Sequence, residues 1–326
     1  MGRLNRLPLA LDVPQALEAP LAALWRDGFV RLAPIFSAPE IAGFRAEGER
    51  LMRDIRPWAE RHARYRQTEY LMPPFGDDDW AVLMNLAGRS GTVDELLERL
   101  FTHPRIKGML EAIAGPGYKA WEISLRRANA RDGGLRLHED ARGELGVAML
   151  LADQPAVGAT VFLRGSHRLP VSCREAGAEF IPPKYLSRLT QPATGSAGEI
   201  FVFFKKTWHG RIAGLSPTPS DALLLAVFPV GYEYLPFQPD QDLLRTMGTE
   251  TARLLDPARQ LRPSRDGRCV VTDLDGSTRY QGPPRLIDHL YRPRPRLHPL
   301  RAAALVGGSL RLVQAMTKTR RASAAR

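Results

Sequence analysis

The chain has 326 residues, enough to bury a sizeable core in one large domain or two small ones. Hydrophobic residues make up 44% and charged residues 25%, as in an ordinary globular protein, and there is no run of about 18 uncharged apolar residues that would predict a membrane span. The net charge of +11 is mostly C-terminal, because residues 291–326 carry nine lysines or arginines and no acid; this argues against nucleic-acid binding by the whole protein.

The first third of the chain has the periodicity of helices. Apolar residues at helical spacing predict a helix over 15–26, which ends at the turn-forming pair Asp27-Gly28. Ser37 followed by Glu40 is a capping-box pattern and predicts the start of a second helix. The same signals predict a short strand over 29–32, irregular chain over 56–80 and a further helix over 93–114.

From about residue 118 the pattern changes to short apolar runs separated by Gly, Pro, Asp and Ser. Short strands that follow helices predict a mainly β domain with a helical flank, as a β-sandwich or jelly roll. The predicted strands lie at 119–127, 146–152, 159–163, 199–204 and 222–230, whereas 236–290 has a mixed pattern.

The two ends of the chain and its cysteines give indications of the protein's location in the cell. The N-terminus lacks the long apolar stretch of a signal peptide, and Cys173 and Cys269 have no metal or redox spacing, so we expect a cytoplasmic protein. Its richness in Ala, Arg, Leu, Gly and Pro is typical of GC-rich bacteria. The basic tail, 291–326, is a candidate contact with an anionic membrane surface, which would make the protein peripheral to the inner membrane.

Three residues in the strand-rich region have the composition of a metal site. His138 and Asp140 are two residues apart, so in a strand both point to one face while Glu139 points away. His209 follows the apolar run that starts at Gly198. A His-x-Asp pair alone is common by chance, but two histidines and one carboxylate form the facial triad of non-haem iron(II) oxygenases, which leaves three metal positions open.

Between these two features lies the turn Arg164–Pro170, which contains His167. We interpret His167 as a turn or packing residue rather than a ligand, because it shares neither the spacing nor the strand position of the other two histidines. The turn is therefore part of the sequence pattern, but it contributes no predicted metal ligand.

Five segments, at 24–41, 101–117, 137–140, 158–170 and 198–211, are similar to segments of one enzyme family. By them the chain resembles the phytanoyl-CoA dioxygenase family of iron(II)/2-oxoglutarate oxygenases. The resemblance implies a double-stranded β-helix, a cupin-like jelly roll whose mouth holds the iron. It also implies that His138, Asp140 and His209 are the metal ligands and catalytic residues, with Fe(II) and 2-oxoglutarate as cofactors and O2 as a reactant.

One position departs from the family pattern. The family usually has an arginine about eleven residues after the distal histidine, where it binds the 2-oxoglutarate carboxylate; here that place holds Ser220. Arg211, two residues after His209, should share its face in an extended strand and is the first substitute, with Ser220 adding a hydroxyl. Arg126 and Arg127, on an earlier strand, are the other candidates.

The prediction is therefore an oxygenase domain over 12–290 with its β-helix core at about 118–235. By its resemblance, the enzyme would hydroxylate a small-molecule, lipid or glycan substrate. Because Asp140 is present where related halogenases have a small residue, hydroxylation is favoured over halogenation. The alternative is a catalytically degenerate jelly roll that binds a ligand, which the absent arginine would favour. No nucleic-acid partner is expected.

Overall fold

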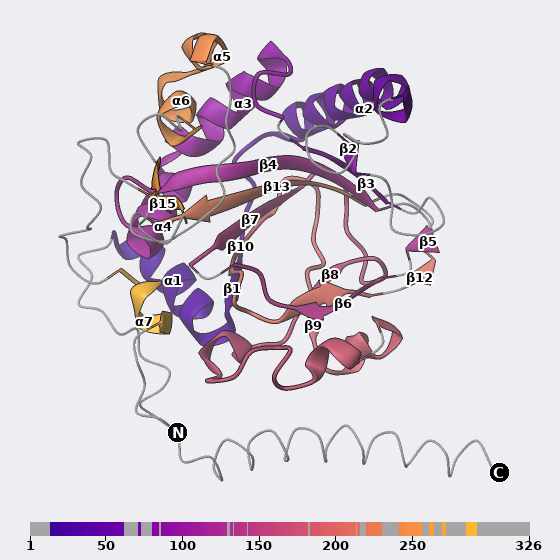
Figure 1. Ribbon diagram of the computed structural model, residues 1–326, viewed down its shortest axis with the longest axis vertical. Helices are drawn as coiled ribbons and strands as arrows, with labels where there is room; N and C mark the ends of the chain where they lie inside the picture. Colours follow the sequence, from indigo (N-terminus) through magenta and orange to yellow (C-terminus); the bar gives the residue numbers. More distant parts are fainter. Residues whose placement is uncertain are drawn as a thin grey trace.

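The computed structural model describes residues 14–61, 71–72, 80–84, 86–128, 131–132, 134–141, 143–181, 183–212, 214–215, 220–229, 241–255, 261–263, 269–271 and 285–291. Within these residues, two antiparallel sheets face each other, and helices cover the outer side of the larger one (Figure 1). The predicted mainly β fold with a helical flank is thereby confirmed.

The strands form a large sheet, a small sheet and two short pairs. In spatial order, the large sheet contains β1 (Phe29–Leu32), β10 (Ile200–Phe204), β7 (Leu145–Leu150), β13 (Ser220–Phe228), β4 (Lys119–Ala128), β3 (Trp80–Leu83) and β2 (Leu71–Met72). The small sheet contains β6 (Leu135–His138), β11 (His209–Arg211), β8 (Thr160–Phe162) and β9 (Gln191–Pro192). The pairs are β12 (Gly214–Leu215) with β5 (Arg131–Asp132), and β14 (Leu261–Pro263) with β15 (Cys269–Val271).

The helices agree with the predicted ones in position but differ in two places. The helix expected over 93–114 is two helices, because Pro104 removes a backbone donor and forces His103 into an extended conformation with ψ 123°. The stretch 56–80, expected to be irregular, contributes the end of one helix and the strand β2. The helices are α1 (Gln15–Asp27), α2 (Ala38–Arg61), α3 (Gly91–Thr102), α4 (Pro104–Ala114), α5 (Gln241–Thr246), α6 (Thr249–Leu255) and α7 (Asp288–Tyr291).

Local signals account for several helix ends. The predicted capping pair is present, since the backbone N–H and the hydroxyl of Ser37 both donate to Glu40 Oε2 at 2.7 Å. Helix α7 ends at Tyr291, whose hydroxyl accepts a hydrogen bond from the Gly143 N–H at 2.9 Å. The first residue of the predicted basic tail therefore belongs to the folded domain, and residues 292–326 lie outside the described part of the chain. Among the described residues, no helix is long and apolar enough to cross a membrane.

The central strand β13 shows how one sheet serves both the core and a cavity. Alternate side chains of a strand point to opposite faces. Leu223, Leu225 and Val227 are at most 1% exposed and belong to the core cluster shared with the helices, whereas Ala222 and Leu224 line a pocket on the other face. The helical layer therefore buries one face of the large sheet and leaves the other for the site.

The turn that contains His167 packs against the C-terminal end of helix α1. Gly28 ends the helix with a φ of 90°, and an added Cβ there would collide with Thr207 and His167. The His167 Nε2–H donates to the Trp25 carbonyl at 2.9 Å, and its ring stacks on Phe204. His167 is fully buried, as the packing interpretation of this histidine requires.

We expect the stability of the protein to depend on pH through His167. Burial lowers the pKa of His167 to about 3, because a proton on Nδ1 would find no acceptor among the described residues. An unfolded histidine binds a proton below about pH 6.5, so the folded state should lose up to about 1.4 kcal/mol of stability per pH unit as the pH falls from that value.

The measurement is denaturant unfolding of the wild type and His167→Gln at pH 7, 6 and 5. Glutamine keeps an N–H for the Trp25 carbonyl but does not titrate, so its stability should depend less steeply on pH. Parallel pH profiles for the two proteins would show that His167 does not contribute.

Candidate metal centre

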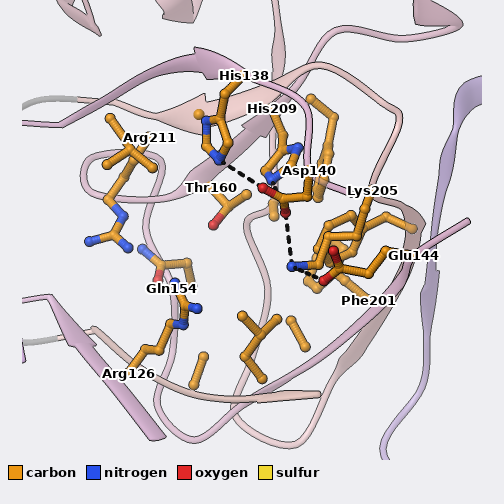
Figure 2. A pocket seen from close by; sticks show the side chains of 18 of the residues that line it. Arg126, His138, Asp140, Glu144, Gln154, Thr160, Phe201, Lys205, His209 and Arg211 are labelled. Carbon is orange, nitrogen blue, oxygen red and sulfur yellow. Dashed lines mark ion pairs between the residues drawn. The ribbon is translucent and has the colours of Figure 1, made fainter. Parts of the chain in front are cut away.

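The three predicted ligands meet where the small sheet faces the cavity. His138 ends β6, Asp140 follows in the adjoining loop, and His209 begins β11. Strand β11 pairs antiparallel with β6 so that His209 lies directly opposite His138, with 4.3 Å between the ring centroids. Strand pairing therefore brings together two histidines from distant parts of the chain (Figure 2).

The ligand atoms converge tightly enough for one metal ion. The Nε2 atom of His138 lies 3.6 Å from Asp140 Oδ1, and the Nε2 atom of His209 lies 3.3 Å from Asp140 Oδ2. One ligand atom from each of the three residues lies within 4.8 Å of the other two. Figure 2 shows all three side chains directed toward one point at the wall of the cavity.

Backbone contacts set the tautomer of both histidines. The Nδ1 atom of His138 lies 2.9 Å from the Arg136 carbonyl, and that of His209 lies 2.8 Å from the Thr207 carbonyl. A carbonyl only accepts, so each Nδ1 carries the proton and each Nε2 directs a lone pair at the carboxylate. Burial, followed by the neighbouring His209, lowers the pKa of His138 to about 4, which keeps that ring neutral.

This arrangement fits a metal ion. Two imidazole lone pairs and a carboxylate at these distances repel one another unless a cation lies between them. Two nitrogens and one oxygen are the ligand set of the iron(II) facial triad. His138, Asp140 and His209 are therefore the residues that would hold the iron.

The Asp140 carboxylate is held in its charged form. Burial alone would raise its pKa, but the positive charge of Lys205 and the hydrogen bond that its ammonium donates hold the pKa well below its usual range. Lys205 Nζ lies 2.9 Å from Asp140 Oδ2. Burial would lower the pKa of Lys205, but Glu144, Asp140 and Glu122 outweigh it and raise that pKa, so the ammonium is also charged.

The centre opens into a cavity of about 410 Å³ between the two sheets. Its lining contains both apolar and polar side chains, which suits a small ligand that carries polar groups. The apolar residues include Leu150, Phe162, Phe201, Phe203 and Leu224, and the polar residues include Glu122, Arg126, Glu144, Gln154, Thr160, Lys205 and Arg211.

The candidate cosubstrate residues do not all reach this cavity. Arg211 and Arg126 line it, and Figure 2 shows both directed inward. Arg127 is a correction: it follows Arg126 in β4 and so points to the opposite face, where it pairs with Asp221 at 2.7 Å and with Glu49 at 2.6 Å. Ser220 begins β13 opposite Ala128, but its side chain lies outside the described part of the structure.

Two charged residues beside Asp140 were missed by the sequence reasoning. Lys205 and Glu144 both line the cavity and form an ion pair at 3.0 Å. For Lys205 the signal was present, since it directly follows β10 and continues the alternation of Phe201 and Phe203 on the inward face. Glu144 lies just before β7, and no local pattern distinguishes it from a surface acid.

The chain is similar in sequence to known dioxygenases. A family model described as Phytanoyl-CoA dioxygenase (PhyH) matches residues 24–217. An ectoine dioxygenase from Bordetella parapertussis is 26% identical over 232 residues, which span 60% of this chain and 69% of that protein.

Solved structures are similar in fold. EctD from S. alaskensis, with bound Fe, matches with a TM-score of 0.54 and 20% identity over 72% of this chain and 86% of that one. SnoN, a non-haem alpha-ketoglutarate-dependent epimerase from nogalamycin biosynthesis, matches with a TM-score of 0.53 and 21% identity over 80% and 98%. These matches confirm the expected double-stranded β-helix.

We expect His138→Ala and His209→Ala each to abolish stoichiometric Fe(II) binding and iron-dependent turnover, because each removes one of the three candidate ligands. Metal content after anaerobic loading and desalting is the measurement. Glu139→Gln is the matched control, since Glu139 adjoins both ligands in sequence but does not line the cavity. Full iron occupancy in the double alanine variant would rule the ligand assignment out.

Proposed function

The chain belongs to the phytanoyl-CoA dioxygenase family and is a 2-oxoglutarate-dependent dioxygenase with Fe(II) as its metal, and on that premise we propose that it hydroxylates a small molecule. The observation that carries the proposal is the convergence of His138, Asp140 and His209 at the wall of a cavity of about 410 Å³. Cavities of this size bind small molecules. When bound, iron and 2-oxoglutarate supply the oxidising chemistry: O2 is consumed, 2-oxoglutarate becomes succinate and CO2, and one oxygen atom enters the substrate.

The residues of the chain would orient the reactants and exclude water. Phe162, Phe201 and Phe203 form an aromatic wall next to His209, with Phe203 and His209 ring centroids 5.5 Å apart. Such a wall would surround the reacting C–H bond with apolar groups and limit the entry of water. Between the small-molecule, lipid and glycan classes, the cavity volume favours the first, and so does the activity named for the ectoine dioxygenase relative.

A catalytically degenerate ligand-binding protein is the alternative, supported by Ser220 in place of the family arginine. The complete donor set with fixed tautomers argues against it, because a protein that had lost its chemistry would have no need to keep three converging lone pairs. An anaerobic titration with Fe(II) and 2-oxoglutarate, followed by the visible charge-transfer band, separates the two possibilities. Succinate release and a product with one added oxygen atom would then establish hydroxylation, whereas a protein that develops no band would be a ligand binder.

Arg211 is our candidate for the residue that holds the distal carboxylate of 2-oxoglutarate. It lies on the same strand as His209, two residues further along, and lines the cavity with Thr160. Arg126 also lines the cavity, but it lies on β4 of the facing sheet, where its guanidinium pairs with Glu122 at 2.7 Å. A buried dicarboxylate needs a cation, and a guanidinium can bind a carboxylate through two parallel hydrogen bonds.

We therefore expect Arg211→Ala to raise the half-saturating concentration of 2-oxoglutarate roughly ten- to a hundredfold, as the loss of about 1.5–3 kcal/mol from charged hydrogen bonds implies. Iron binding should persist, because Arg211 is not a ligand. The measurement is succinate formation against 2-oxoglutarate concentration in the wild type, Arg211→Ala and Arg126→Ala. Unchanged half-saturation in Arg211→Ala with a large increase in Arg126→Ala would transfer the role to Arg126.

A further inference from the structure

We propose that Lys205 is a positioning residue for the metal: it holds the Asp140 carboxylate in the one orientation that faces both histidines. The inference rests on the proposed metal centre and adds a residue outside the ligand set. It begins from the place of Asp140, which lies in the loop after β6 and outside the pairing that aligns His138 with His209. Something other than the sheet must therefore fix its side chain.

Lys205 makes this contact from a fully enclosed position. Its side chain is 6% exposed, and its Nζ lies 2.9 Å from Asp140 Oδ2 and 3.0 Å from Glu144 Oε1. Figure 2 shows the ammonium between the two carboxylates, with Asp140 between Lys205 and the histidines. The Phe203 ring also lies near the ammonium, with its centroid 5.8 Å from Nζ.

Lys205 also forms hydrogen bonds through its main chain, to Asp140 and to Glu144. The Asp140 N–H donates to the Lys205 carbonyl at 3.0 Å, and the Lys205 N–H donates to the Glu144 carbonyl at 3.0 Å. The Glu144 side chain in turn accepts a hydrogen bond from the Ala141 N–H at 3.2 Å. Lys205 therefore restrains both the main chain and the carboxylate of Asp140, and Glu144 restrains Lys205.

The charge of Lys205 makes this role testable, because positioning and charge repulsion predict opposite changes in metal affinity when Lys205 is removed. A positive charge next to a metal site repels the metal, so if Lys205 were only a nearby charge, its removal would tighten metal binding. If Lys205 positions Asp140, its removal should instead weaken metal binding. Groups that orient metal ligands typically contribute 10–100-fold in affinity.

The experiment is an anaerobic calorimetric titration of the metal-free protein with Mn(II) and with Fe(II), in the absence of 2-oxoglutarate and substrate. We expect Lys205→Met, which keeps the length but not the charge, to bind metal about 10–100-fold more weakly than the wild type. Unchanged or tighter binding would overturn the proposal. Failure of the wild type to bind metal would instead refute the metal centre itself.

Two control variants separate positioning from the cost of an unpaired buried acid. Glu144→Gln keeps the Lys205–Asp140 contact and should bind metal within a few-fold of the wild type. Lys205→Met/Glu144→Gln removes both buried charges and is the less disruptive variant if the single one fails to fold. Weak binding that persists in the double variant supports positioning, whereas recovery to wild-type affinity would assign the loss to unpaired Glu144.

The visible spectrum of bound Co(II), which reports ligand geometry, gives a second readout. It should change in Lys205→Met and in the double variant but not in Glu144→Gln, because only Lys205 contacts the ligand. Identical Co(II) spectra in the wild type and Lys205→Met would contradict the inference.

Discussion

The site depends on one strand pairing. Strand β11 lies antiparallel between β6 and β8, and its register with β6 places His209 opposite His138. A shift by one residue would turn one histidine out of the cavity, because adjacent side chains point to opposite faces. The large sheet supplies the facing wall of the cavity: its outer face is buried under the helices, and its inner face carries Phe201, Phe203, Glu122 and Arg126 (Figure 1).

Charge balance is the second constraint. Among the described residues that line the cavity, Glu122, Asp140 and Glu144 are acids, and Arg126, Lys205 and Arg211 are bases. Fe(II) carries two positive charges and 2-oxoglutarate two negative ones, so binding both would leave the enclosed site without a net charge. Such a balance lowers the cost of burying charges in a medium of low dielectric constant. The proposed role of Arg211 fits this balance, because Arg211 contributes a positive charge to the same cavity as the three candidate metal ligands.

Local patterns predicted the features that local physics controls. Helical spacing located α1, and the capping pair Ser37 and Glu40 located the start of α2, because both are set by neighbours within a turn of the helix. Alternation along a strand predicted that His209 and Arg211 would share a face, and both line the cavity. The prediction for Arg127 was wrong. Adjacent side chains of a strand point to opposite faces, so Arg126 faces the cavity and Arg127 faces away from it, and the sequence does not say which face is the inner one.

The sequence by itself determined the kind of chemistry, through the residue types and spacing of His138, Asp140 and His209, and the class of fold, through short apolar runs after amphipathic helices. Only the tertiary structure decided which groups surround that chemistry. The ion pairs of Lys205 with Asp140 and Glu144 and the pairing of Arg126 with Glu122 depend on strand register and burial. A strand also needs partners for its backbone hydrogen bonds, so β2 and β3 exist because β4 provides an edge to pair with. Such contacts join residues whose distance in space bears no fixed relation to their distance along the chain.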